Sequence, residues 1–311
     1  MTPSASVVIP SLHGGRRLVE AVDLLLSSTI PTEVVVADNG LPAATVAGLR
    51  AARAAVVPMG ANLGFGAAVN RAAQAAEGDV LVVLNDDVSP RPAFVERLTS
   101  PLANGADVVA GILVDEARPD VIETAGIEID AALSPYDYLQ GEPVARLEEP
   151  LAPPLGPCGG AAAYRTSAFR AVGGFDEGFF AYGEDLDLAI RLRLAGASFG
   201  FARDATATHV ASQTLGYHSL AKATLVGYSR GYLLRKYGVL RRPRLAARAL
   251  GVELAASVVL LARHRSLAPG AARVRGWRGC RVTAPPPPSS AATVGLVDGV
   301  RRRYARSNRG R

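Results

Sequence analysis

Short apolar runs alternate with segments of helical periodicity along the first part of the chain. Runs typical of parallel strands buried on both faces occupy residues 6–10, 33–38 and 79–84. The intervening segments carry apolar residues three and four positions apart, which predicts helices at 16–28, 43–54 and 67–76. This alternation predicts an α/β fold with a parallel sheet.

The pattern continues less regularly after residue 106. Strands are expected at 107–114, 122–129 and 198–201, and an extended piece at 205–210. Residues 220–237 form a predicted helix, and an apolar run follows at 249–262. This run is about 14 residues long and contains Glu253, so we expect it to be too short to span a bilayer.

Composition divides the 311 residues into three segments. Residues 1–217 hold the α/β pattern, 218–284 a basic helical extension, and 285–311 a proline-rich linker with a basic tail that is predicted to be disordered. Apolar residues make up 49% and charged residues 20%, as in globular proteins. The formal charge of +6 reflects arginines concentrated after residue 230, which favours a peripheral contact with an anionic membrane or a solvated surface.

The cysteines and the N-terminus indicate a reducing compartment. Cys158 and Cys280 stand far apart in unlike contexts, so the sequence predicts neither a disulfide framework nor a cysteine zinc site. The first residues lack the basic and apolar regions of a signal peptide. We therefore expect a cytoplasmic protein, with the inner face of the cell membrane as a further location.

Carboxylates follow two of the predicted strands. Asp38 ends the second run, and Asp86 and Asp87 end the run at 79–84. Because ligands of such sheets bind beyond the carboxyl ends of the strands, one crevice is expected to hold all three. The turn at 10–16 lacks a Gly-x-Gly-x-x-Gly pattern, and no phosphate-binding P-loop occurs, which disfavours dehydrogenases and ATPases.

Helix capping is the alternative role for the carboxylates at 86 and 87. Ser89 and Pro90 are expected to supply the N-cap and first-turn proline of a helix at 92–98. Asp86 and Asp87 are then left to face a metal or a phosphate group.

A second acidic cluster lies in residues 173–188, where a glycine-rich and aromatic loop enters a helix. Asp187 and Arg191 are four apart, which predicts an ion pair on the solvent side. Asp185 has no such partner, so its role is either to meet the helix dipole or to act in the site. His209, further along, is either structural or the ligand that completes an oxygen-rich site.

In this order the motifs resemble family 2 inverting glycosyltransferases with the GT-A fold, and within them the rhamnosyltransferase-like enzymes of bacterial cell-wall and polysaccharide assembly. That fold is a Rossmann-like, mostly parallel nucleotide-binding sheet flanked by helices. The resemblance covers about residues 5–215 and depends on the motifs at 6–10, 34–40, 62–70, 84–87 and 173–188.

The resemblance implies a role for each matching residue. Asp185 corresponds to the general base, and Asp87 and His209 to ligands of Mg²⁺ or Mn²⁺. The residues implied to bind the nucleotide sugar are Pro10, Asp38, Asn62, Gly64, Asn70, Asp86 and Glu184.

Two positions depart from the family pattern. Asn85 stands where many relatives have Asp, and Leu41 replaces a small hydroxyl residue after 38–40. The first weakens a metal site inferred from Asp-x-Asp alone, and the second leaves recognition of the nucleobase open.

The implied function is transfer of a sugar from a nucleotide-diphosphate donor to a hydroxyl of a glycan or lipid-linked acceptor. dTDP-rhamnose is the favoured donor, and a UDP-hexose transferase acting on a small-molecule acceptor is the alternative. A sugar-nucleotide nucleotidylyltransferase is disfavoured because residues 14–17 form only a short Gly- and Arg-bearing turn. A non-catalytic nucleotide-sugar-binding or nucleic-acid-binding module would use the basic C-terminus, but the acidic clusters would repel a phosphate backbone.

Overall fold

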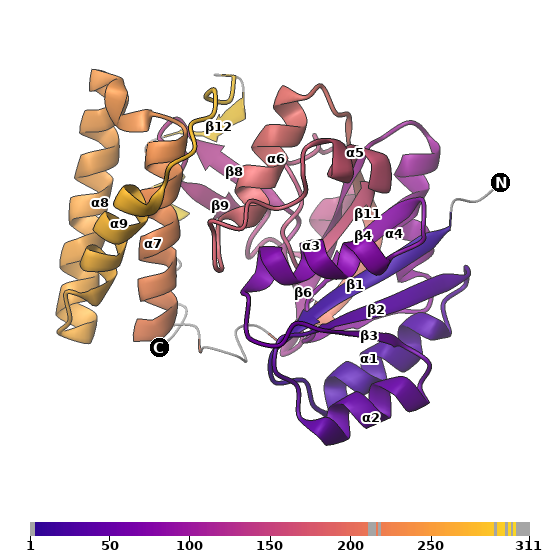
Figure 1. The fold of residues 1–311 in the computed structure, drawn as a ribbon. Coiled ribbons are helices and arrows are strands. Elements are labelled where there is room, and N and C mark those ends of the chain that lie inside the picture. Colours follow the sequence, from indigo (N-terminus) through magenta and orange to yellow (C-terminus); the bar gives the residue numbers. More distant parts are fainter. Residues whose placement is uncertain are drawn as a thin grey trace.

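A computed structural model of the chain describes residues 4–210, 216, 219–288, 291–295, 298–299 and 301–302. A layered α/β domain holds the N-terminal part, and three C-terminal helices form a further layer beside it (Figure 1). The predicted boundary between residues 217 and 218 lies outside the described residues.

The main sheet has nine strands. These are β1 (Ala5–Ser11), β2 (Thr32–Asp38), β3 (Ala55–Pro58), β4 (Val80–Leu84), β5 (Val88–Pro90), β6 (Val108–Asp115), β7 (Arg118–Thr124), β10 (Ala161–Arg165) and β11 (Phe199–His209). Their order is β3-β2-β1-β4-β10-β6-β11-β5, and β7 pairs with β6. Since β11 is one strand with a bulge between Phe201 and Thr206, it joins the two extended pieces that the sequence predicts separately.

The predicted parallel sheet is correct for its first half. Strands β1 to β4 are parallel, whereas β10 runs antiparallel to both β4 and β6. Strand β5 is antiparallel to β11, and β7 to β6, so the second half of the sheet is mixed. Because Ala161 of β10 faces Leu84 of β4, β10 begins at the edge of the sheet where β4 ends.

Helices cover both faces of the sheet. Alternating residues of β1 belong to two cores: Val7 and Ile9 join α1 (Arg16–Leu26), α2 (Ala43–Ala51) and α4 (Phe94–Ala103), and Val8 joins the other core. That second core contains residues of α3 (Phe65–Ala75), α5 (Thr166–Ala171) and α6 (Glu184–Leu194). Figure 1 shows α1 and α2 below the sheet and α3 in front of it.

A small second sheet contains a strand from the C-terminal tail. Strands β8 (Ile127–Asp130) and β9 (Pro135–Asp137) are antiparallel, and β12 (Ala292–Val294) adds to β8 in parallel. The predicted disorder of 285–311 is therefore wrong for residues 292–294. The physical reason is pairing with β8, reinforced by the Arg302–Glu128 ion pair at 2.5 Å. Residues 303–311 lie outside the described part.

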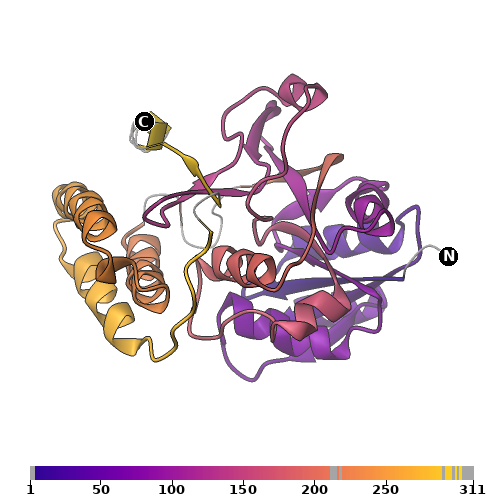
Figure 2. The ribbon, with the colours of Figure 1, turned by 90° about the horizontal axis from the view of Figure 1, so that it is seen from above.

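The basic extension folds into helices α7 (Leu220–Lys236), α8 (Pro243–His264) and α9 (Ala268–Gly279), with a short turn η2 (Val239–Arg241). A further turn, η1 (Val144–Glu148), lies in the main domain. Helices α7 and α9 approach closely at Gly231, where a Cβ would collide with the carbonyl oxygen of Arg273. Figure 2 shows α8 on the outer side of this layer.

Helix α8 is longer than the apolar run that the sequence singles out. It has 22 residues, and by length and composition it is the candidate membrane span among the described residues. The expectation that this segment is too short to span a bilayer is therefore wrong as regards length.

Candidate active site

The carboxyl ends of β1 and β2 bring two predicted nucleotide-binding positions together. Asp38 is the register partner of Ser11, and Pro10 lies one residue earlier, buried within β1. One carboxylate oxygen of Asp38 accepts the backbone N–H groups of Gly40 (2.9 Å) and Leu41 (2.6 Å). Asp38 therefore shapes the turn that follows β2.

Ser11 connects this edge to Asp86. Its hydroxyl donates to Asp86 Oδ2 at 2.5 Å and accepts the N–H of Gly14 at 3.1 Å. Burial raises the pKa of Asp86, although the Ser11 hydrogen bond opposes this shift. No local sequence pattern indicates Ser11, because its partner lies 75 residues away.

Asp86 and Asp87 do not cap a helix, but the predicted reason is wrong. Ser89 and Pro90 belong to β5, which pairs with β11, and α4 begins at Phe94 without a side-chain cap. The strand β5 therefore separates the acidic pair from the helix.

Asp87 and His209, the two predicted metal ligands, lie next to each other. His209 ends β11, and its Nε2 is 2.9 Å from Asp87 Oδ1. Its Nδ1 is 2.7 Å from Oε2 of Glu123, a residue of β7 that the sequence analysis missed. Burial lowers the pKa of His209, but the carboxylates of Asp87 and Glu123 outweigh it and raise this pKa to about 10.

The donor atoms of this pair fit a divalent cation. Asp87 Oδ1 and His209 Nε2 are buried, and although they are close, neither has a partner in hydrogen-bonding geometry. A carboxylate oxygen and an imidazole nitrogen are both accepted by Mn²⁺, and Glu123 would orient the ring through its other nitrogen. The described residues contain no group of three or more His, Cys, Asp or Glu side chains that could hold a metal by itself.

The second acidic cluster opens α6. Gly183, with φ 90°, precedes the helix, and Glu184 and Asp185 form its first turn. Glu184 is 6% exposed, and its Oε2 has no hydrogen-bond partner among the described residues. Burial and the neighbouring charge of Asp185 raise the pKa of Glu184 to about 8, so this carboxyl is mostly protonated at pH 7.

Asp185 is partly exposed at the N-terminal end of α6. Its two carboxylate oxygens accept the N–H groups of Leu186 (2.8 Å) and Gly159 (3.2 Å). Burial raises the pKa of Asp185, and these two hydrogen bonds oppose the shift. Neither oxygen is paired with a cation in the described part of the chain, which leaves a carboxylate that can accept a proton.

The start of β10 joins the two acidic clusters. Gly159 contacts Asp185, while the carbonyl oxygen of Gly160 accepts the N–H of Asn85 at 3.4 Å. Burial raises the pKa of Tyr182, and the negative charges of Glu184 and Asp87 add to this effect. Tyr182 is therefore within electrostatic reach of both clusters, so they border one region of the protein.

Residues 62–64 occupy the loop before α3. Asn62 is exposed, and its Oδ1 accepts the N–H of Gly64 at 3.0 Å. The buried side chain of Asn39 holds the same loop through Leu63 N–H (3.2 Å) and the Gly64 carbonyl (3.1 Å). Gly64 has φ 84°, and a Cβ there would collide with the Phe180 carbonyl oxygen. This glycine lets the loop before α6 approach α3.

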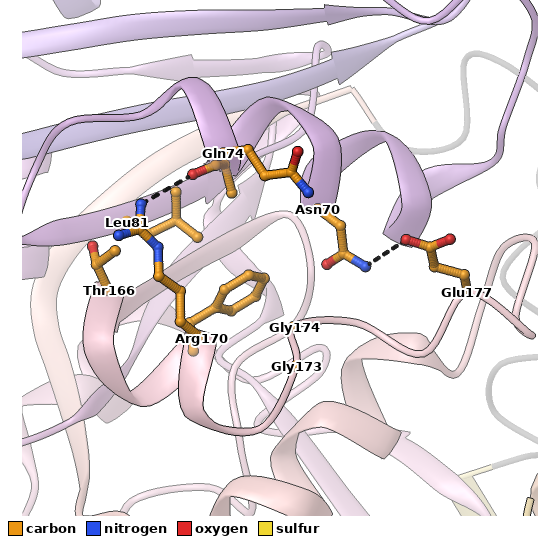
Figure 3. A pocket seen from close by; sticks show the side chains of 10 residues that line it. Asn70, Gln74, Leu81, Thr166, Arg170, Gly173, Gly174 and Glu177 are labelled. Carbon is orange, nitrogen blue, oxygen red and sulfur yellow. Dashed lines mark hydrogen bonds between the residues drawn. The ribbon is translucent and has the colours of Figure 1, made fainter.

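Asn70 uses its side-chain amide to hold that same loop. It accepts the N–H of Phe175 (2.8 Å) and donates to the Phe175 carbonyl (2.9 Å) and to Glu177 Oε1 (3.1 Å). Asn70 and Arg170 both line a cavity of about 220 Å³ between α3 and α5. Figure 3 shows these two side chains on opposite sides of the cavity. In the structure Asn70 thus supports the loop that leads to Asp185.

Asp187 is not on the solvent side, which corrects the sequence prediction. Its side chain is fully buried and forms ion pairs with Arg191 Nε (2.7 Å) and Lys236 Nζ (2.6 Å). It also accepts a hydrogen bond from the Tyr237 hydroxyl (2.8 Å). Lys236 and Tyr237 come from the end of α7 and the residue after it. Helix α6 is thereby attached to the C-terminal helices through its acidic first turn.

Comparison with known proteins places this arrangement in a family. The family model described as "Glycosyl transferase family 2" matches residues 6–173, more than half of the chain. The chain belongs to glycosyl transferase family 2. A second model, described as "N-terminal domain of galactosyltransferase", matches residues 155–213, which contain Asp185 and His209.

Several known proteins resemble this family 2 chain. It is 34% identical over 204 residues to an N-acetylglucosaminyl-diphospho-decaprenol L-rhamnosyltransferase of Mycobacterium tuberculosis, and the match covers 56% of this chain and 64% of that protein.

Two solved structures share the GT-A fold. One is the mannosyltransferase PcManGT from Pyrobaculum calidifontis in complex with GDP-Man and Mn²⁺ (TM-score 0.55, 17% identity, 99% of this chain and 80% of that chain). The other is GalNAc-T7 with UDP, GalNAc and Mn²⁺ (TM-score 0.56, 15% identity, 76% of this chain and 50% of that chain).

Proposed function

We propose that this chain is an inverting glycosyltransferase in which Asp185 is the general base. The observation that carries the proposal is the position of Asp185 at the start of α6, hydrogen-bonded to Gly159 and joined through β10 to the edge that holds Asp86 and Asp87. In this arrangement a donor diphosphate would lie at the strand ends and an acceptor beside α6.

In the proposed reaction, Asp185 takes the proton of an acceptor hydroxyl. The hydroxyl oxygen forms a bond to the anomeric carbon while the bond from that carbon to the donor diphosphate breaks on the opposite face. The nucleoside diphosphate leaves, and the anomeric centre is inverted. Glu184, protonated at pH 7 because of its raised pKa, can donate a hydrogen bond to a sugar hydroxyl.

Asp87 and His209 would hold Mg²⁺ or Mn²⁺, with the donor phosphates as further ligands. The cation would offset the charge that develops on the leaving diphosphate. The Mn²⁺ named with two solved structures of the same fold supports this assignment. Asp38, Asp86 and the 62–64 loop would surround the nucleoside.

The proposed donor is dTDP-rhamnose, and the proposed acceptor is a lipid-linked glycan of cell-wall or surface polysaccharide assembly. The name of the mycobacterial relative supports rhamnose as the sugar and a lipid-linked acceptor, and the match covers less than two thirds of that protein. Such an acceptor favours a location on the cytoplasmic face of the cell membrane.

The test is hydrolysis and transfer by the purified chain with a panel of dTDP- and UDP-sugars, with Mn²⁺, with Mg²⁺ and with EDTA. We expect metal-dependent release of one nucleoside diphosphate, abolished by Asp87→Ala. The control Asp23→Asn, on the exposed face of α1, should behave as the parent. If no donor binds or turns over, the proposed function is wrong.

A further inference from the structure

Helix α8 turns its one acidic residue toward the protein and its large apolar residues toward solvent. Glu253 is 8% exposed and pairs with Arg230 (2.6 Å) and Arg273 (2.9 Å). The next residue, Leu254, points away from this ion-pair cluster and is 68% exposed. The apolar face of α8, as we call it, consists of Leu250, Leu254, Val258 and Leu261, which helical geometry places on one side. Large contiguous apolar surfaces of this kind mark interaction sites.

The surroundings of the apolar face are strongly cationic. Between residues 219 and 284 Glu253 is the single acidic residue, whereas Lys and Arg number fourteen. Arg242 and Arg244 are exposed at the N-terminal end of α8, and Arg265 at its C-terminal end. An apolar stripe bounded by arginines is the pattern of a helix lying in the headgroup region of an anionic bilayer.

The polar contacts of α8 argue against insertion across the bilayer. Arg230, which holds Glu253, also donates to the carbonyl oxygens of Leu133 (2.6 Å) and Ala132 (2.8 Å) in the turn between β8 and β9. Near its midpoint, α8 is therefore fixed to the α/β domain. A spanning orientation would break these ion pairs and leave Glu253 near the bilayer centre, at considerable cost.

Self-association is a weaker explanation for the same surface. In a symmetric dimer the apolar face would pack against the same face of a second copy. The arginines at the ends of α8 in one copy would then lie close to those of the other copy. Like charges in such a contact repel one another, whereas anionic lipid headgroups neutralise them.

We propose that α8 lies in the plane of an anionic bilayer, with Leu254 and Val258 among the acyl chains and the flanking arginines at the lipid phosphates. The helix is about 33 Å long at 1.5 Å per residue, so it offers an extended contact. This interaction requires no catalysis, so its test is independent of the proposed glycosyl transfer.

The experiment is flotation of the full chain with vesicles of phosphatidylcholine and phosphatidylglycerol, compared with phosphatidylcholine alone. We expect binding to the anionic vesicles that weakens with salt. The double substitution Leu254→Asn, Val258→Asn should reduce binding about tenfold or more. Both side chains are exposed, so the thermal midpoint of unfolding should stay close to that of the parent.

A matched control changes two apolar residues of similar chemistry on another helix. Leu24 and Leu26 are exposed on α1, which lies below the main sheet and away from α8 (Figure 1). Leu24→Asn, Leu26→Asn should leave vesicle binding unchanged.

Two outcomes would overturn the proposal. One is equal vesicle binding by the parent and the α8 double variant. The other is a parent dimer in light scattering that the double variant abolishes without any vesicle binding, which would identify a second copy as the occupant of the apolar face.

Discussion

Lys236, near the end of α7, places its ammonium group 2.6 Å from Oδ1 of Asp187 in α6, with both side chains out of solvent. The same ammonium is 2.5 Å from Asp176 Oδ2, in the loop that leads to α6. Burial raises the pKa of Asp176, but Lys236 together with hydrogen bonds from Gly178 N–H and the Tyr232 hydroxyl lowers this pKa overall. One buried cation therefore joins the C-terminal helices to both the loop that leads to α6 and the helix that carries Asp185.

Replacing Lys236 with Met should destabilise the protein by about 3–5 kcal/mol, because the buried carboxylate of Asp187 and the partly buried carboxylate of Asp176 lose their shared cation. Urea unfolding followed by circular dichroism measures this change. Arg71→Met, on the exposed surface of α3, removes a cation of similar size and should change stability by less than about 0.5 kcal/mol. A small effect of Lys236→Met would show that the α6–α7 contact depends on apolar packing instead.

Asp185→Asn should lower kcat by about 10²–10⁴-fold, because Asn cannot take a proton from the acceptor. Glu184→Gln is the matched comparison in the same helical turn. Since the raised pKa keeps Glu184 protonated at neutral pH, its neutral amide should cost about tenfold or less. Steady-state kinetics with the identified donor would compare the two. A larger loss of kcat for Glu184→Gln than for Asp185→Asn would mean that Glu184, and not Asp185, is the general base.

Stability should fall with rising pH because of Glu184. Its folded-state pKa of about 8 exceeds the ordinary value of 4.5, so the folded protein retains a proton that the unfolded chain releases between these values. The free energy of unfolding therefore decreases as pH rises through that interval. Glu184→Gln should flatten this dependence, which denaturant titrations at a series of pH values would show. If Glu184→Gln leaves the dependence of the free energy of unfolding on pH unchanged, another buried group causes that dependence.

Gly64→Ala should impair both folding and activity, because the new methyl group displaces the Phe180 carbonyl and with it the loop before α6. Gly60→Ala is a close control: Gly60 also has a positive φ, 76°, but a Cβ there meets nothing within 4 Å. The control should cost about 1–2 kcal/mol from backbone strain alone.

The measurements are thermal unfolding and kcat for each variant. Gly64→Ala should lose more stability than Gly60→Ala and should lower kcat as well. Equal effects of the two substitutions would mean that backbone strain alone matters and that the loop accommodates the methyl group.

The sequence alone singled out candidate residues whose contacts are local or whose motif is familiar. Asp185 stood out because the residues three and four positions on, Leu188 and Ala189, are not cations, and Asp86 and Asp87 because they follow a buried strand. Glu123 and Ser11 could not be identified, since their partners lie 86 and 75 residues away and depend on strand order. The strand order itself involves β10, whose antiparallel direction no local pattern indicates.

The C-terminal region shows the same limit. Periodicity predicted helix α7 well, but it could not show that Lys236 meets Asp187, because that contact depends on how two helices pack. It also placed residues 292–294 in a disordered tail, because three residues of β propensity carry little information without their partner β8. Pairing across more than 160 residues, as in the hydrogen bond from Thr293 to Glu128, requires the fold.

That pairing affects how the protein can be made. Strand β8 leaves the ribosome long before β12, so one edge of the β8–β9 hairpin stays open while the residues between them are synthesised. The small sheet is completed only once residue 294 has emerged, and until then the exposed edge is available to other extended chains. Slow translation of the C-terminal helices would lengthen this period, and a chain that stops before residue 292 would retain the open edge permanently.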